Sequence, residues 1–372
     1  MQEHVYWLAL SRVEGMGPRR FHRLLERFGS PRRVWECDEE ELRRAGDIPL
    51  SLGHNILRAR EGKGEREALA EIERLAGEGV RILTLADPEY PVNLRSIHDP
   101  PPVLYLRGNL QPGDARAVSL VGTRRASSYG LMVAETLGRE LAAAGVTVVS
   151  GLARGVDTAA HRGALGAGGR TIAVLGCGLD RPYPPENRRL LAEIARQGAA
   201  LSEYPPGTPP LPRNFPARNR IISGLSLGTV VVEAGEKSGA LITADFALEQ
   251  GREVLAVPGP VTGKGSRGTN RLIKQGARLV EEARDILEEL GLESLFTVAT
   301  GGRPADGSVP GGAALTADER QLLDFLASGP LDIEELACRS GLPAGRLNAC
   351  LIYLEIKGLV RQLPGKCFIR VP

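Results

Sequence analysis

Four short turns in this chain of 372 residues combine glycine, hydroxyl and basic side chains, the residue types that bind phosphate groups. The first, residues 122–127 (GTRRAS), follows the apolar run 117–121 and precedes a stretch with helical apolar spacing. Free N–H groups at a helix N-terminus, hydroxyls and an arginine fork can all donate to an anion. Turns 150–155 (SGLARG), 237–240 (KSGA) and 265–270 (GSRGTN) are similar. Glycine and serine are also ordinary turn residues, so only the four turns together predict phosphate binding.

Residues 213–220 (RNFPARNR) alternate cations with an aromatic ring in a chain whose aromatic content is only 4%. Phe215 could stack on a nucleic-acid base, as aromatic side chains do in proteins that bind single strands. It could equally fill the core beneath this segment. The sequence favours neither interpretation.

Motifs typical of enzymes are incomplete here. Residues 224–228 (GLSLG) match the G-x-S-x-G pattern, but an apolar strand follows them, whereas a nucleophile elbow comes after its strand. Residues 263–266 (GKGS) resemble a P-loop, yet Pro258 stands where the first glycine belongs. Asp157 and His161 are spaced four apart on one expected helix, where we expect the aspartate to hold the histidine. We predict no catalytic residues, no metal site and no cofactor.

The elements that must position these turns alternate between strands and helices. Short apolar runs predict eight strands, at residues 80–85, 103–106, 117–121, 146–150, 171–175, 199–202, 229–233 and 253–257. Helix-like stretches, such as 131–144 and 241–250, lie between the last six. Buried strands without polar alternation, separated by helices, form a parallel sheet covered on both faces. The carboxyl ends of such strands share one edge, so the turns should converge on one crevice of a Rossmann-like α/β domain.

Further modules are expected on both sides of this domain. Residues 1–72 have helical apolar spacing, with Pro18 at a helix start and Gly29 after its end, and predict a helical domain of SAM or helix-hairpin-helix type. The extended Rossmann-like domain should span residues 73–293, and the Gly/Pro-rich stretch 294–314 predicts a flexible linker. Residues 315–372 show three helices and then two strands around a Pro-Gly turn, the order of a winged helix.

The charge of the chain is nearly balanced, with 47 Lys and Arg against 45 Asp and Glu, which excludes a histone-like polycation. Residues 111–280 nevertheless hold 21 basic and 13 acidic side chains, and the acidic run 281–293 offsets part of this excess. A positive field on one domain favours an anionic partner.

The five cysteines form no C-x-x-C pair, which favours a reducing cytoplasm over a disulfide framework. The N-terminus lacks the pattern of a signal peptide, and no apolar run approaches the ~18 residues of a membrane span. We therefore expect a cytoplasmic protein that does not bind membranes.

Long motifs between residues 80 and 280 resemble those of the DprA/Smf family of DNA-processing proteins. In order, they are VGTR (121–124), SYG (128–130), VSGLARGVDTAAH (149–161), LSEYP (201–205), FPARNRII (215–222) and EA through SGALITA (233–244). The flanking helical and winged-helix modules agree with the three-part architecture common in that family.

The resemblance implies a mediator of recombination that binds single-stranded DNA, protects incoming DNA during natural transformation, loads the RecA recombinase, and forms a homodimer through its Rossmann-like domain. The family's Gly-Ser/Thr-Arg motif falls on Gly122, Thr123 and Arg124, of which Arg124 is the expected main phosphate contact. Its Phe-Pro-x-Arg-Asn-Arg segment falls on Phe215, Arg218, Asn219 and Arg220. The remaining residues of the predicted DNA-binding site are Arg154, Arg213, Lys237, Ser238 and Gly239.

Two other functions remain as alternatives. A related Rossmann-like group of enzymes cleaves nucleoside monophosphates, and the predicted crevice could hold one nucleotide. A winged-helix regulator would instead bind duplex DNA sequence-specifically through residues 315–372. The third helix of that module offers only Arg346 and Lys357 as basic residues, so protein contact is as consistent with it as weak duplex binding.

Overall fold

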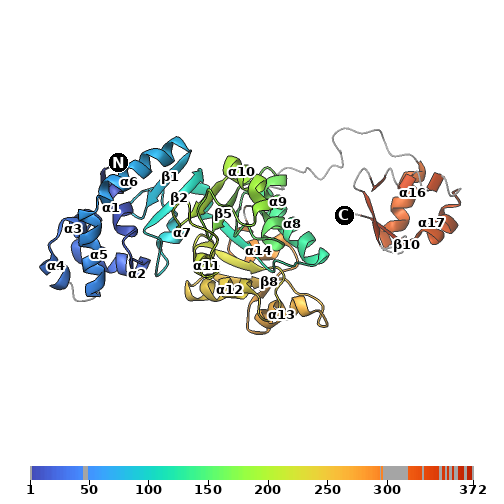
Figure 1. The fold of residues 1–372 in the computed structure, drawn as a ribbon. Coiled ribbons are helices and arrows are strands. Elements are labelled where there is room, and N and C mark those ends of the chain that lie inside the picture. The colour runs from blue at the N-terminus through green and yellow to red at the C-terminus, as the bar shows by residue number, and fades with distance from the viewer. Residues whose placement is uncertain are drawn as a thin grey trace. The chain divides into compact units, whose positions relative to one another are not determined.

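The computed structural model describes residues 2–44, 49–293, 295, 317–328, 331–342, 346–347, 350–351, 354–355, 359–363 and 367–370 (Figure 1). The chain forms two compact units, residues 1–302 and 303–372, which are described separately. The predicted linker 294–314 lies outside the described residues, apart from Leu295.

The first unit is built on a sheet of nine strands, in the order β1-β2-β6-β5-β4-β3-β7-β8-β9. Their bounds are β1 Val80–Thr84, β2 Val103–Gly108, β3 Ala117–Val121, β4 Thr147–Ser150, β5 Thr171–Leu175, β6 Ala199–Ser202, β7 Gly228–Val231, β8 Glu253–Ala256 and β9 Arg278–Leu279. The eight predicted strands are confirmed, and β9 was not predicted.

Seven strands of this sheet, from β6 to β9 in the sheet order, are parallel, and this arrangement was predicted for six of them, β3 to β8. The first two strands are antiparallel: β1 pairs with β2, and β2 pairs with β6 in the register Tyr105↔Ser202. The α/β Rossmann-like fold class is therefore confirmed, with an antiparallel extension at one edge.

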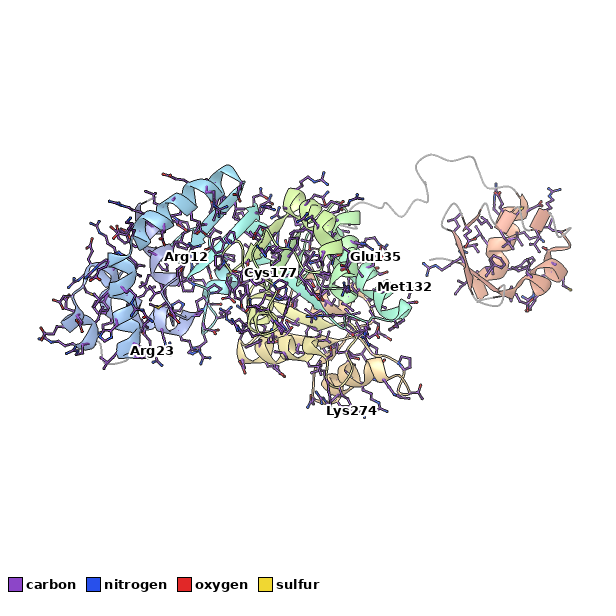
Figure 2. The ribbon with its side chains drawn as sticks, viewed as in Figure 1. Arg12, Arg23, Met132, Glu135, Cys177 and Lys274 are labelled. Carbon is purple, nitrogen blue, oxygen red and sulfur yellow. The ribbon has the colours of Figure 1, made fainter. Side chains whose placement is uncertain are left out.

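Helices cover both faces of the sheet, because its buried strands carry apolar side chains on alternate sides. In β3, Val118 and Leu120 share a core cluster with α8 (Ser128–Ala143), α9 (Val156–Gly166) and α14 (Ala283–Glu289). Ala117 and Val121 share another with α11 (Asn214–Gly224), α12 (Gly239–Glu249), α13 (Arg267–Lys274) and the short α7 (Val92–Arg95). Side chains fill the space between the layers, and Met132 and Glu135 lie on the outer side of α8 (Figure 2).

The chain order creates a switch point between β3 and β7. Strands β3 to β6 follow one another across the sheet, and the chain then returns to place β7 on the other side of β3. The helix after β3, α8, packs on one face, whereas the helix after β7, α12, packs on the opposite face. Open α/β sheets bind ligands in the crevice that forms at such a point, outside the carboxyl ends of the strands.

Six helices precede the sheet in the described part of the chain: α1 Gln2–Ser11, α2 Pro18–Phe28, α3 Pro31–Glu36, α4 Glu39–Arg44, α5 Leu50–Glu61 and α6 Gly64–Gly77. As expected, Pro18 opens α2, and Gly29 closes it with φ +80°. Their core continues into the sheet, since Leu8, Trp35 and Leu75 belong to one buried cluster with Val80 and Tyr105. The predicted end of the first domain, residue 72, lies inside helix α6. The position of that domain boundary stays a prediction.

The second unit has the arrangement of a winged helix, which confirms that prediction. It contains α16 (Ala317–Phe325), the short η4 (Leu326–Ser328), α17 (Ile333–Ser340) and a three-stranded sheet in the order β10-β12-β11. The strands are β10 Leu331–Asp332, β11 Val360–Leu363 and β12 Cys367–Arg370. The unit has its own core, which includes Leu322, Leu336 and Phe368.

The expected third helix of this unit falls partly outside the described residues, as does Lys357. Those described between positions 346 and 355 are helical. Arg346 forms an ion pair of 2.6 Å with Asp318, so one of the two basic residues noted in the sequence is engaged within the unit.

Candidate nucleic-acid-binding site

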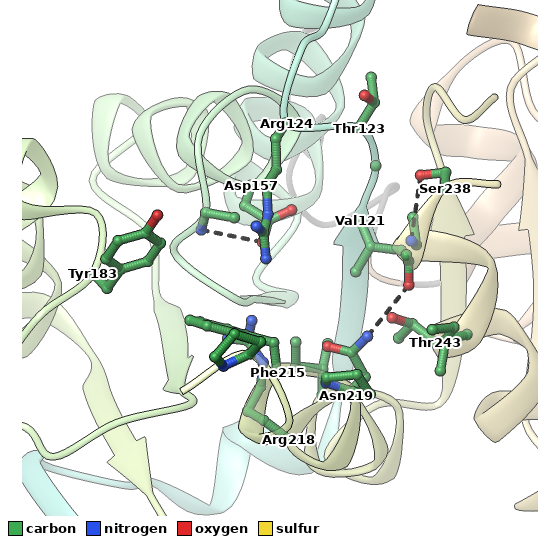
Figure 3. Close-up of a pocket in the computed structure, with 18 of the residues that line it drawn as sticks. Val121, Thr123, Arg124, Asp157, Tyr183, Phe215, Arg218, Asn219, Ser238 and Thr243 are labelled. Atoms are coloured by element: carbon green, nitrogen blue, oxygen red, sulfur yellow. Dashed lines mark hydrogen bonds between the residues drawn. The ribbon is translucent and has the colours of Figure 1, made fainter. Parts of the chain in front are cut away.

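A pocket of about 630 Å³ lies at the switch point of the sheet (Figure 3). It is lined from the end of β3 by residues 121–125 and from the start of α12 by residues 238–240, 242 and 243. Helix α11 contributes Phe215, Arg218 and Asn219, and the other lining residues include Asp157 of α9 and Tyr183. The structure thus brings together eight of the twelve residues predicted to bind DNA: Gly122, Thr123, Arg124, Phe215, Arg218, Asn219, Ser238 and Gly239.

The loop after β3 is fixed against the end of β7. The Thr123 N–H donates to the Glu233 carbonyl at 2.7 Å. A Cβ at Gly122 would lie 3.0 Å from that same carbonyl oxygen and 2.8 Å from the Val156 Cβ, so only glycine allows this close approach. Residues 122–124 therefore lie against the segment that follows β7, and the side chain of Arg124 extends into the pocket (Figure 3).

The N-terminus of α8 is occupied by a carboxylate of the protein itself. Glu233, which is buried, accepts hydrogen bonds from the Ser127 N–H at 3.0 Å and the Ser127 hydroxyl at 2.8 Å. We expected the N–H groups of this turn to be free for phosphate. That expectation is wrong for Ser127, because the carboxylate already supplies the negative charge that a helix N-terminus attracts.

Arg124 lies over an aromatic surface. Its guanidinium carbon is 5.2 Å from the centroid of the Phe215 ring, within the range of a cation–π contact. The Tyr183 ring, from the loop between β5 and α10 (Arg188–Gln197), lies 5.7 Å from the same centroid at an interplanar angle of 50°. Phe215 is partly exposed and lines the pocket, while its ring also packs against Gly176, where a Cβ would lie 3.0 Å from the ring.

Arg218 holds the pocket together from beneath. It is 3% exposed and donates hydrogen bonds to the carbonyls of Gly151, at 2.7 Å, and Val174. Burial lowers the pKa of its guanidinium, although the negative charge of Asp157 opposes this shift. The geometry thus supports a positioning role for Arg218, which ties α11 to the ends of β4 and β5.

Asp157 and His161 do not form the pair that we expected. Asp157 accepts hydrogen bonds from the Gly151 and Ala153 N–H groups, at 3.1 and 3.3 Å, and so braces turn 150–155. Burial raises the pKa of Asp157, and the charge of Arg218 opposes the rise. His161 instead bonds to the Thr171 hydroxyl at 2.7 Å, and burial lowers its pKa to about 3.

The start of α12 faces the pocket and is linked to α11. Ser238 is the N-cap, with its hydroxyl accepting from the Ala240 N–H at 3.4 Å. The Asn219 amide donates to the Gly239 carbonyl at 3.3 Å, a bond drawn in Figure 3. This helix N-terminus, unlike that of α8, has no protein carboxylate bonded to it among the described residues, so it can meet an anion.

Four of the predicted DNA-binding residues lie outside the pocket. Arg154 is exposed and pairs with Glu186, and Arg213 and Lys237 are exposed without lining the pocket. Arg220 is 5% exposed and pairs with Glu203 at 2.6 Å and Asp99 at 3.3 Å. Its placement corrects the prediction: residues 218 and 220 are only two apart on one helix, so they point in different directions. The two carboxylates also satisfy the charge of Arg220.

The fourth predicted turn, 265–270, does not line the pocket either. Asn270 hydrogen bonds to both the N–H and the carbonyl of Gly259, and the Thr269 hydroxyl donates to the Ser266 carbonyl. These side chains brace their own loop, which explains their residue types without an anion.

The predicted site did not include twelve of the residues that line the pocket, and Tyr183 and Arg125 are the aromatic and the basic side chain among them. Tyr183 follows β5, whose carboxyl end lies at the same edge of the sheet as that of β3. A rare aromatic residue in a loop at that edge could have indicated it. Arg125 was within a noted turn but was not included among the site residues.

The described part of the chain contains no cluster of three or more His, Cys, Asp or Glu residues arranged to hold a metal ion. A search of the same residues for helices long and apolar enough to cross a bilayer found none.

The fold and the site define a class: a Rossmann-like protein with a cationic, partly aromatic pocket at its switch point, and with a winged-helix unit in the same chain. Comparison with known families specifies it further. The model described as DNA recombination-mediator protein A matches residues 81–291, the DprA winged helix domain matches 307–366, and the DprA-like N-terminal HHH domain matches 1–46. The chain belongs to the DprA/Smf family.

Individual relatives agree with this assignment. Protein Smf of Synechocystis is 36% identical over 99% of both chains. The crystal structure of DNA processing protein A from Streptococcus pneumoniae is similar with a TM-score of 0.68 and 36% identity, and covers 78% of this chain and 98% of its own. DNA processing protein A from Helicobacter pylori, studied for its single-stranded DNA binding mode, matches with a TM-score of 0.51 and 34% identity over 56% of this chain and 95% of its own.

Proposed function

We propose that this protein binds single-stranded DNA in the switch-point pocket and acts as a cytoplasmic mediator of recombination. The observation that carries the proposal is the convergence of Arg124, the Phe215 and Tyr183 rings and the N-terminus of α12 on one open pocket. The membership of this chain in the DprA/Smf family supports the same proposal, as does the single-strand binding mode studied in the similar protein from H. pylori.

Each part of the pocket matches a part of a nucleotide. The Arg124 fork and the N–H groups at the start of α12 can donate to phosphate oxygens. The aromatic rings can stack on a base, an interaction that tolerates any sequence. Bases in a duplex are stacked and paired, so their faces are accessible only in a single strand. A pocket that uses both contacts therefore favours single-stranded over duplex DNA.

Fluorescence anisotropy with a labelled oligo-dT and a duplex of equal length tests this proposal. The protein should bind the single strand more tightly, and Arg124→Ala should weaken that binding by on the order of 10- to 100-fold, the loss expected for a hydrogen bond to a charged group. Phe215→Leu, which keeps an apolar side chain without the ring, should lose on the order of 10-fold or more. Arg139→Ala removes a cation from the exposed far part of α8 and serves as the matched control.

Wild-type affinity in Arg124→Ala would refute the site, and equal affinity for both DNA forms would refute the preference. Steady release of free base from nucleoside monophosphates, abolished in Arg124→Ala, would instead support the alternative enzyme.

We also propose that the protein protects incoming DNA during natural transformation, loads the RecA recombinase onto it and forms a homodimer through the Rossmann-like domain. The family description as a recombination mediator supports the first two parts. Sedimentation of residues 1–302 tests dimerisation. The rate at which RecA nucleates on single strands coated with a single-strand binding protein tests loading: the rate should rise with this protein present and return to the basal value with Arg124→Ala.

A further inference from the structure

A second hollow, of about 730 Å³, runs along α10 and lies outside the switch-point pocket. Asp180, Pro182 and Arg188 line it near the start of α10, and Arg107 of β2 and Arg196 line it near the helix end. The turn between α6 and β1, residues 78–79, forms part of its wall. We call this hollow the α10 groove.

The cations of the α10 groove are free, whereas its acidic residues are engaged. Among the described residues, no ion pair or side-chain hydrogen bond involves Arg107, Arg188 or Arg196. Glu78 pairs with Arg74 at 2.5 Å, and Asp180 accepts hydrogen bonds from the Gly207 N–H at 2.9 and 3.0 Å. The groove therefore presents uncompensated positive charge, which attracts an anion.

These cations are held at defined positions along the groove. Arg188 and Arg196 are eight residues apart on one helix, which corresponds to about 12 Å. Gly108 packs β2 against the end of α10 so closely that a Cβ there would lie 2.5 Å from the Ala195 and Gly198 carbonyl oxygens. This packing places Arg107 near the end of α10 that carries Arg196. Cations therefore lie at both ends of the α10 groove.

One loop separates this groove from the switch-point pocket. In the segment between β5 and α10, Tyr183 lines the pocket, while the neighbouring Pro182 and, further on, Arg188 line the groove. A polymer that leaves the pocket beside Tyr183 therefore reaches Arg188 by crossing the wall of a single loop.

We propose that the α10 groove binds the sugar–phosphate backbone of the single-stranded DNA segment adjacent to the one in the pocket. This inference rests on the proposed function of the pocket. The groove has arginines but no aromatic side chain in its lining, so it matches phosphates and not bases, and its contacts are independent of sequence. An acidic protein partner is disfavoured, because such interfaces depend on large aromatic or arginine anchors seated in pockets, and small residues such as Ala192 and Ala195 line the groove.

Binding to oligo-dT of increasing length, measured by anisotropy at several salt concentrations, tests the groove. An oligonucleotide of about four nucleotides is meant to occupy the pocket alone, whereas one of about 20 nucleotides also reaches the groove. The double variant Arg188→Ala/Arg196→Ala should bind the short oligonucleotide as the wild type does. On the long one it should bind on the order of 10-fold more weakly at 0.15 M salt, and its salt slope should fall by about 1.4, since each lost phosphate contact on a single strand contributes about 0.7.

Arg189→Ala is the matched control, because Arg189 is exposed on the same helix but does not line the groove. Thermal melting checks that all variants are folded. If the double variant binds both oligonucleotides as the wild type does, the proposal that the α10 groove binds DNA is refuted. That result would be expected if the groove instead bound an acidic protein. An equal loss at both lengths would also overturn the proposal. Failure of the wild type to bind the short oligonucleotide would instead refute the proposed function of the pocket, so the two failures are distinguishable.

Discussion

Replacing Arg220 by alanine should destabilise the first unit of the protein without removing a direct contact to DNA. The sequence placed Arg220 beside Arg218 in the DNA-binding segment, but the structure buries it against Glu203 and Asp99. Burial lowers the pKa of Arg220, yet the two carboxylates outweigh this, and the pKa lies above its usual value. The charge on Arg220 is therefore retained for the fold.

The magnitude follows from what the substitution leaves behind. Removing one partner of a buried ion pair costs about 3–5 kcal/mol, because the other charge stays buried without compensation. With an unfolding entropy of ~2.1 cal/mol/K per residue, 1 kcal/mol shifts the melting temperature of a unit of this size by ~1.6 °C, so the variant should melt roughly 5–8 °C lower.

The effect should also depend on pH. Burial already raises the pKa of Glu203, with Arg220 opposing the rise, so the variant should raise it further. A carboxyl group whose pKa is higher in the folded state stabilises the fold when protonated, and that stability is lost as the pH rises through the folded pKa. The loss relative to the wild type should therefore be larger at pH 8 than at pH 5.

Calorimetry of residues 1–302 at these two pH values measures the loss, and oligo-dT binding is measured well below the melting temperature. Arg124→Ala is the informative comparison, because Arg124 is exposed: its melting temperature should change by about 1–2 °C at most while its DNA affinity falls. The reasoning is wrong if Arg220→Ala melts like the wild type but loses DNA binding.

Two further predictions concern buried groups around the site. His161→Gln should flatten the pH dependence of the free energy of unfolding. The pKa of the wild-type histidine is about 3 in the folded state and about 6.5 in the unfolded state, so the wild type loses stability as the pH falls below 6.5, by about 2 kcal/mol at pH 5. Urea unfolding at pH 7 and pH 5 measures this loss, which the variant should lack. Gly130→Ala should destabilise the fold by about 1–3 kcal/mol in thermal melting, because its Cβ would lie 1.9 Å from the Glu233 carboxylate, whereas Gly166→Ala, with no atom within 4 Å, should not. Equal melting of the two glycine variants would contradict this packing argument.

Most strands of the sheet could be predicted from the sequence, because a strand that is buried on both faces appears as a short run of apolar residues. Strand β9 left no such trace, since Arg278 and Leu279 are both exposed. The antiparallel pairing of β1 and β2 was equally hidden, because an apolar run carries no strand direction. The turns were placed at one edge because chain order and strand parallelism decide which ends coincide.

The directions in which side chains point were the main feature that could not be predicted from the sequence. Residues 213–220 have weak helical apolar spacing, so the helix α11 was not anticipated, and without a helix the opposite directions of Arg218 and Arg220 could not be assigned. Similarly, nothing in the run GTRRAS indicates that Glu233, more than 100 residues later, fills the N-terminus of α8. A protein carboxylate that takes the place expected for a bound anion can be recognised only in the three-dimensional structure, where distant segments lie together.

The shared core of the N-terminal helices and the sheet bears on how such chains can be shortened or recombined. Val80, Val103 and Tyr105 are covered in part by the cluster that contains Leu8 and Trp35, so a fragment beginning near residue 80 would expose an apolar surface to water. The C-terminal unit has a core of its own, and none of its core residues belongs to the clusters of the first unit. A shortened chain should therefore keep the N-terminal helices together with the strands β1 and β2 that they cover.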